Sequence, residues 1–360
     1  MELLRQSLLA TIVAMGLILS ACQGTGVSGG GGGGKKVALL LPESKTARYE
    51  SHDRPLFEGK LKALCSDCEI IYSNADQDAT KQQSQAEAAL TNGAKVMVLD
   101  AVDGAAASVI ADRAKAAKVP VISYDRLITG TDTVDYYISF DNERVGKLQG
   151  ESLLQALSGK PNPTIVMING APTDNNAKLF KAGAHSMLDG KANVAKEYDT
   201  PDWSPDRAQE EMTQALTALG NKVDGVYAAN DGTAGGAIAA MKAAGLNPLP
   251  PVTGQDAELP AIQRVIAGEQ FMTVYKAIKP EAETAAEMAS NLLAGKPIGD
   301  EITKGKTVNN GKKDVPSVLL DPVAVTKGNV KETVVQDSFW TKEQICAGAY
   351  AEACKSAGLS

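Results

Sequence analysis

The run Val37-Ala38-Leu39-Leu40-Leu41 decides the fold together with two later runs, KVMVL at 95–99 and VPVISY at 119–124. A strand that is buried on both faces shows such a continuous apolar stretch rather than an alternating one. Helical patterns separate the runs: Asp78 can cap a helix that ends near Asn92, and residues 105–117 predict another. Alternating strands and helices predict parallel sheets covered by helices on both sides.

The same rhythm continues through the second half of the chain. Strands are predicted at 164–168, 194–198, 223–228, 252–254 and 271–275, with helices at 143–157, 176–188, 233–244 and 279–293. About ten strands in two runs favour an α/β protein with two doubly wound parallel-sheet lobes. An eight-unit barrel is the competing architecture, and the number of units does not decide between the two.

The N-terminal residues predict export and attachment to a membrane. Residues 1–21 predict a signal peptide, whose apolar stretch Leu8–Leu19 is too short to span a bilayer comfortably. It ends in Leu19-Ser20-Ala21-Cys22, which resembles the lipobox of bacterial lipoproteins and makes Cys22 the expected lipid attachment site. In the alternative, an ordinary signal peptide is cut nearby and Cys22 has no role. Residues 22–35, with six consecutive glycines, predict a flexible tether.

The cysteines that remain are consistent with an exported protein. Two disulfides are expected from Cys65, Cys68, Cys346 and Cys354, each cysteine with its near neighbour, although other pairings, a redox motif or a zinc site stay open. The net charge of −7 and the pI of about 5.1 argue against nucleic-acid binding. No phosphate-binding glycine motif lies at a strand–helix junction, so we expect no nucleotide. We expect no other cofactor and no metal site, although a structural calcium ion stays open.

Polar side chains follow seven of the predicted strands, and in open parallel sheets ligands bind beyond these carboxyl ends. The clusters are Arg48 and Tyr49, Asp125 and Arg126, Asp141 and Asn142, Asp202 and Trp203, Asn230 and Asp231, Gln255 and Asp256, and Lys276. Planar carboxylate, amide and guanidinium groups can hold neighbouring sugar hydroxyls, and aromatic rings can stack on the apolar faces of a sugar. Because buried charges need partners, we expect Arg126 to pair with Asp125 and Lys276 with Asp256. Singly, each residue could equally be a turn or capping residue.

Several stretches in order resemble the D-xylose-binding proteins of bacterial ABC importers, which belong to the type I periplasmic binding proteins. They are SYDRLI at 123–128, YISFDNE at 137–143, DNNAKLF at 174–180, NDGTAGG at 230–236, GQDA at 254–257 and TVYK at 273–276. The resemblance covers residues 36–339. It implies a sugar-binding cleft formed by Arg48, Tyr49, Asp125, Arg126, Asn142, Trp203, Asn230, Asp256 and Lys276. Tyr49 stands where the family usually has a tryptophan, and the C-terminal tail from Thr341 also departs from the family.

The resemblance also implies how the protein works. Three crossings near Asn142, Lys276 and Pro322 form the hinge between an N-terminal lobe (36–142 and 277–321) and a C-terminal lobe (143–276 and 322–360). Both lobes close on one monosaccharide, and a membrane permease takes it up. D-Xylose is the first candidate, with glucose, arabinose and galactose open. We expect a monomer without enzymatic activity.

Three other functions share parts of this pattern. A sugar-responsive repressor would need an N-terminal helix-turn-helix, whose place is taken here by the signal peptide and the glycines. An exported glycoside hydrolase would need two positioned carboxylates, which the sequence does not forbid. A sugar sensor that feeds a chemoreceptor or a sensor kinase would differ only in its partner.

Overall fold

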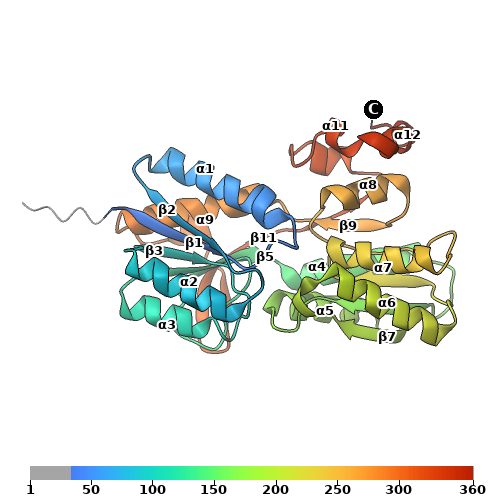
Figure 1. The fold of residues 1–360 in the computed structure, drawn as a ribbon, viewed down its shortest axis with the longest axis horizontal. Helices are drawn as coiled ribbons and strands as arrows, with labels where there is room; N and C mark the ends of the chain where they lie inside the picture. The colour runs from blue at the N-terminus through green and yellow to red at the C-terminus, as the bar shows by residue number, and fades with distance from the viewer. Residues whose placement is uncertain (1–33, 360) are drawn as a thin grey trace, which may run out of the picture. The chain divides into compact units, whose positions relative to one another are not determined.

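The computed structural model describes residues 34–359, and these residues form two α/β lobes (Figure 1). The predicted signal peptide, Cys22 and nearly all of the predicted tether lie outside the described residues. The open sheets of the lobes exclude the eight-unit barrel and confirm the doubly wound fold. Among the helices of residues 34–359, none combines the length and apolar character that crossing a bilayer requires.

The first lobe contains a seven-stranded sheet in which only the edge strand β10 is antiparallel. Its central strands are continuous apolar runs because helices cover both faces: α1 and α9 pack on one side, and α2 and α3 on the other (Figure 1). The strands in spatial order are β10 (Thr307–Asn309), β11 (Asp314–Leu320), β5 (Tyr136–Phe140), β4 (Val121–Tyr124), β3 (Val96–Leu99), β1 (Lys36–Leu41) and β2 (Glu69–Asn74). The helices are α1 (Arg54–Leu64), α2 (Ala79–Thr91), α3 (Ser108–Ala116), α9 (Ile278–Leu293) and α10 (Asp300–Thr303), and the π-helical turn η1 (Tyr49–Asp53) precedes α1.

The second lobe is built on the parallel strands β7 (Asn193–Asp199), β6 (Thr164–Asn169) and β8 (Gly225–Ala228). The predicted strand 252–254 makes only one bridge, Val252 to Val226, yet its backbone bonds extend the sheet to β9 (Met272–Tyr275), which pairs with β12 (Val323–Thr326). Helices α4 (Asn142–Ala156) and α5 (Asn175–Leu188) cover one face, and α6 (Pro205–Leu219) and α7 (Asp231–Ala243) the other. Helix α8 (Leu259–Ala267), the short helix η2 (Pro201–Trp203) and the C-terminal elements η3 (Lys331–Val335), α11 (Lys342–Ile345), η4 (Gly348–Tyr350) and α12 (Ala351–Ser356) complete the lobe.

The chain passes between the two sheets three times. The passages lie between β5 and α4, between β9 and α9, and between β11 and β12. The first and third run side by side, since the backbone N–H of Asp141 donates to the carbonyl of Leu320 at 3.0 Å. The carboxyl ends of β4 and β5 therefore face the second lobe, which places their polar residues between the lobes.

All four cysteines within the described residues form disulfides. Cys65 is bonded to Cys68 and Cys346 to Cys354, each to its near neighbour. Cys65 and Cys68 also lie beside Asp67 in a group that could otherwise ligate a metal. Because thiolates are needed to bind zinc, the oxidised pairs leave no zinc site of four cysteines in this structure.

Two glycines allow α4 and α5 to approach closely. A Cβ atom on Gly146 would lie 1.9 Å from the carbonyl oxygen of Phe180, and one on Gly183 would lie 2.1 Å from the carbonyl oxygen of Glu143. Both obstacles are backbone atoms, so the helices themselves would have to separate.

We predict that Gly146→Ala lowers the free energy of unfolding by about 1–3 kcal/mol, since overpacking forces the backbone apart. Urea denaturation followed by circular dichroism measures the change. Gly59→Ala is the matched control, because Gly59 is exposed in α1 and its Cβ would meet nothing within 4 Å. It should leave stability unchanged or raise it by up to about 1 kcal/mol. Equal stability of both variants would contradict the close packing of α4 on α5.

Candidate functional site

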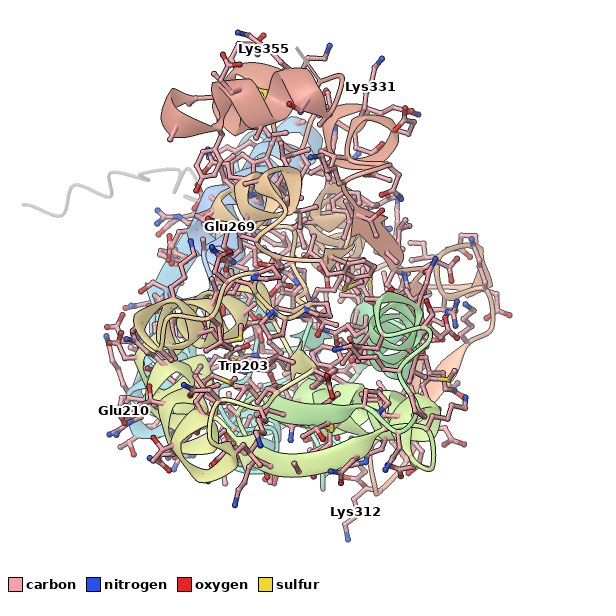
Figure 2. The ribbon with its side chains drawn as sticks, turned by 90° about the vertical axis from the view of Figure 1, so that its right-hand side faces the viewer. Trp203, Glu210, Glu269, Lys312, Lys331 and Lys355 are labelled. Carbon is pink, nitrogen blue, oxygen red and sulfur yellow. A yellow bond between two sulfur atoms is a disulfide. The ribbon has the colours of Figure 1, made fainter. Side chains whose placement is uncertain are left out.

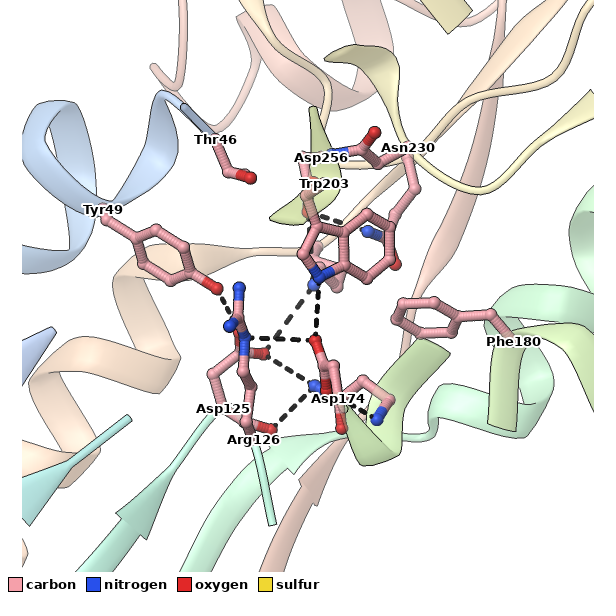
Figure 3. Close-up of a pocket in the computed structure, with 12 residues that line it drawn as sticks. Thr46, Tyr49, Asp125, Arg126, Asp174, Phe180, Trp203, Asn230 and Asp256 are labelled. Carbon is pink, nitrogen blue, oxygen red and sulfur yellow. Dashed lines mark hydrogen bonds and ion pairs between the residues drawn. The ribbon is translucent and has the colours of Figure 1, made fainter. Parts of the chain in front are cut away.

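A small cavity lies between the carboxyl ends of the two sheets (Figure 3). The space between the atoms that line it, part of which is open to solvent, amounts to about 250 Å³. Its lining combines aromatic rings with charged and amide side chains. The lining residues are Thr46, Tyr49, Asp125 and Arg126 from the first lobe and Asp174, Asn176, Phe180, Trp203, Asn230, Gln255, Asp256 and Lys276 from the second.

Seven of the nine predicted site residues line this cavity, namely Tyr49, Asp125, Arg126, Trp203, Asn230, Asp256 and Lys276. The other two lie one layer behind it. Arg48 binds Asp53 and Glu281 at 2.6 Å each, while Asn142 donates to Ser139 and to Asn176. We infer that both hold lining residues in place, because Arg48 lies 3.5 Å from Asp125 and Asn142 bonds Asn176.

Arg126 does not pair with Asp125 as expected. Its Nε lies 3.1 Å from Oδ2 of Asp174 in the opposite lobe and 3.6 Å from Asp100, and its Nη2 lies 3.6 Å from Glu43. Arg126 therefore joins the lobes across the cavity (Figure 3). The Nε–H is not directed at an acceptor within the described residues, so it can donate to a ligand hydroxyl.

Lys276 pairs with Asp256 as expected, at 3.2 Å, and lies 3.8 Å from Asp125. Burial alone would raise the pKa of Asp125, but Arg48, Lys276 and Arg126 hold it at about 2. Asp125 is consequently an ionised acceptor. Tyr49 donates to it at 3.0 Å, and Asn176 of the second lobe donates to its backbone carbonyl at 2.9 Å.

Trp203 forms one aromatic wall of the cavity, and its indole N–H donates to Asp174 at 3.1 Å. Phe180 meets it edge-on at 6.3 Å, and Gly170 makes room for it, since a Cβ there would lie 2.0 Å from the indole ring. Its φ of 53° is unusual for a bulky residue, and such conformations cluster at functional sites. Trp203 thus both packs in the core and faces the cavity.

Five lining residues were not predicted as ligand contacts, namely Thr46, Asp174, Asn176, Phe180 and Gln255. Asp174, Asn176 and Phe180 lie in the DNNAKLF stretch, which was the only signal for them. Gln255 belongs to the predicted polar cluster with Asp256 but is not among the contacts that the resemblance implies. Its Oε1 is buried without a hydrogen-bond partner within the described residues.

The comparisons with known proteins agree with this geometry. Residues 37–297 match the family model described as the periplasmic binding protein domain. The chain belongs to the periplasmic binding protein family. It is 40% identical to a D-xylose-binding periplasmic protein of Haemophilus influenzae, over 86% of this chain and 91% of that protein, which confirms the resemblance seen in the sequence.

Two further similar proteins are described with other ligands. The chain is 36% identical to a multiple sugar-binding periplasmic receptor of Rhizobium radiobacter, over 86% of this chain and 92% of that protein. A solved ABC transporter solute-binding protein of Clostridium phytofermentans, with bound β-D-glucose, matches with a TM-score of 0.80 and 30% identity, covering 86% of this chain and all of that chain.

A second group of carboxyls lies beside the cavity. Burial is the main reason why the pKa of Asp231 is raised to about 7 and that of Glu258 to about 8. Nearby carboxylates contribute to the rise, Asp256 for both groups and Asp231 for Glu258, whereas Arg264 opposes it. Asp231 accepts from Gln270, Thr273 and the backbone of Glu258, and Glu258 accepts from the backbone N–H of Ala47 in the first lobe.

These raised pKa values predict that stability falls as pH rises. A carboxyl whose pKa is higher in the folded state binds its proton more tightly there, so stability is lost between the unfolded pKa of about 4 and the folded pKa. We expect the free energy of unfolding to decline from about pH 4 to about pH 8, and Glu258→Gln to make this decline shallower. Urea denaturation across this range measures it. Glu210→Gln, at an exposed residue, is the control and should keep the wild-type slope.

Proposed function

We propose that the protein is the substrate-binding component of an ABC importer and that it encloses one monosaccharide, D-xylose first among the candidates. The observation that carries the proposal is the lining of the cavity, which combines aromatic rings with charged and amide groups from both lobes, the groups that a sugar's apolar faces and hydroxyls need. The names of the relatives support a sugar, since they include D-xylose-binding proteins and a multiple sugar-binding receptor. Glucose, arabinose and galactose remain the other candidates.

Binding would act through closure of the lobes. We propose that residues 36–142 with 277–321 and residues 143–276 with 322–360 move as two bodies about the three passages. A ligand stabilises the closed form only through contacts that the open form lacks. Here those contacts would come from Tyr49, Asp125 and Arg126 on one side and from Trp203, Asn230, Gln255 and Asp256 on the other. The closed protein would then be recognised by a permease, and the sugar leaves chemically unchanged.

Calorimetric titration of the purified protein with D-xylose, D-glucose, L-arabinose and D-galactose tests the proposal directly. We expect one site per chain and a more compact scattering profile with the bound sugar. Turnover of aryl glycosides or oligosaccharides would instead indicate a hydrolase. Absence of any heat of association with all four sugars would overturn the proposal.

We predict that Trp203→Ala and Asp256→Asn each weaken sugar binding at least tenfold. Losing a stacking ring or a charge-assisted hydrogen bond costs about 1.5–3 kcal/mol, and about 1.4 kcal/mol corresponds to tenfold. Asparagine suits position 256 because Asp256 has a φ of 93°, which asparagine tolerates better than most residues. Asp202→Asn, at an exposed neighbour of Trp203, should bind as the wild type. Unchanged dissociation constants for both site variants in calorimetry would refute the site.

We also propose that Cys22 carries a lipid anchor and that the glycine-rich residues 22–35 tether the body to the extracytoplasmic face of the membrane. Two acyl chains suffice for stable anchoring. Cys22→Ser should therefore move the protein from the membrane fraction to the soluble fraction and abolish its labelling by a fatty-acid analogue, while sugar binding stays unchanged. A Cys22→Ser protein that still fractionates with membranes would contradict the anchor.

A further inference from the structure

The chain continues beyond β12 into a C-terminal segment, residues 327–359, that packs on α8 (Figures 1 and 2). Ile345, Cys354 and Leu359 are buried there against Ile262 and Val265 of α8. Gln263 of α8 also donates to the carbonyl of Gln344 at 3.1 Å. The disulfide between Cys346 and Cys354 closes the end of the segment. The segment is thus firmly attached to the second lobe.

Two adjacent rings of this segment touch the first lobe. The imidazole of His52 stacks on Phe339 with 4.0 Å between ring centroids, and it meets Trp340 edge-on at 4.7 Å. His52 Nε2 lies 3.2 Å from the carbonyl oxygen of Phe339. Phe339 also packs on Tyr275 of β9 at 5.2 Å. We call His52, Phe339 and Trp340 the aromatic clamp.

On its first-lobe side, the clamp holds the turn that carries a residue of the sugar cavity. His52 lies in η1, which begins at Tyr49. Tyr49 lines the cavity and donates to Asp125. A shift of η1 away from the C-terminal segment would therefore move Tyr49 relative to the second lobe.

On its second-lobe side, the clamp holds another such turn. The indole N–H of Trp340 donates to the carbonyl of Ala257 at 2.8 Å, and Ala257 follows Asp256. Asp256 and Ala257 both have positive φ values, 93° and 50°. An alanine persists in this left-handed region only where its surroundings hold it there. Trp340 is part of what holds it.

We propose that Phe339 and Trp340 are positioning residues for ligand binding. They hold Asp256 in its place in the second lobe. Through His52, they also bring Tyr49 of the first lobe towards the second lobe. This proposal rests on the proposed sugar-binding function. The clamp touches no ligand. It acts by favouring the arrangement in which both halves of the cavity face one another, so its loss weakens binding by raising the population of the open form.

The clamp also gives binding a characteristic dependence on pH. Burial lowers the pKa of His52, and Arg48 lowers it further, while the Phe339 carbonyl and Asp53 oppose the shift. The clamped form therefore prefers the neutral imidazole. The affinity for sugar therefore has its full value above the ordinary histidine pKa of about 6.5. It declines as the pH falls from there towards the lowered pKa of His52 in the clamped form.

Calorimetric titration of the full chain with D-xylose from about pH 5 to pH 8 tests the clamp through four proteins. His52→Ala should weaken binding about fivefold or more at the upper end of this range. His52→Phe keeps a stacking ring without a titratable group, so it should restore wild-type affinity there and remove the decline at low pH. His185→Phe, at the only other histidine of the sequence, is the control and should keep the wild-type pH profile. Wild-type affinity and pH profile in His52→Ala would overturn the clamp.

Hydrogen–deuterium exchange of the ligand-free protein tests the same contact without any sugar. Trp340→Phe removes the N–H that reaches Ala257 and keeps an aromatic ring in the clamp, so the amides of residues 256–258 should exchange about fivefold faster while those of β1 do not change. Unchanged exchange at residues 256–258 would overturn the role of Trp340. If the wild type binds no sugar at all, the proposed function fails, and exchange in Trp340→Phe and His52→Ala then decides the clamp alone.

Discussion

The need to neutralise charge in a buried place governs the region between the lobes. Three cations, Arg48, Arg126 and Lys276, are almost fully buried there together with seven carboxyl groups. The carboxyl groups belong to Glu43, Asp53, Asp100, Asp125, Asp174, Asp256 and Glu281. Burial raises the pKa of Asp100, Asp174 and Glu281, so these carboxyl groups hold their protons more tightly than carboxyl groups in water. Every cation is shared among several carboxyls rather than bound to one.

This shared arrangement suits recognition of a neutral polyol. A sugar hydroxyl can donate to a carboxylate and accept from a guanidinium at the same time, so it can enter the network without leaving a charge unpaired. Arg126 already spans the lobes to Asp174, and its Nε–H and the Oε1 of Gln255 have no hydrogen-bond partner within residues 34–359. The walls of the cavity thus present polar atoms that a ligand can satisfy, with the Trp203 ring beside them.

The sequence predicted the two lobes because buried parallel strands are continuous apolar runs, as in β1 and β3, and glycines or caps separate them from helices. It predicted most of the cavity because polar residues follow seven of the strands and because several of these stretches resemble the xylose-binding family. It could not predict which way a side chain points. Arg48 follows β1, but at the start of η1 its side chain turns inward towards Glu281. This direction could not be predicted because no sequence pattern indicates a π-helical turn. Arg126 was assigned the wrong partner because Asp174 comes from the other lobe, on a loop beyond the end of β6.

The three passages of the chain have a consequence for biogenesis. The first sheet takes β1 to β5 from the start of the chain, but it is completed by α9 and by β11, which ends at Leu320. The second sheet is likewise unfinished until β12 pairs with β9. Neither half can therefore reach its native structure on a ribosome or a translocation channel before nearly the whole polypeptide has emerged. Such interleaving makes the completion of both halves depend on the last elements of the chain.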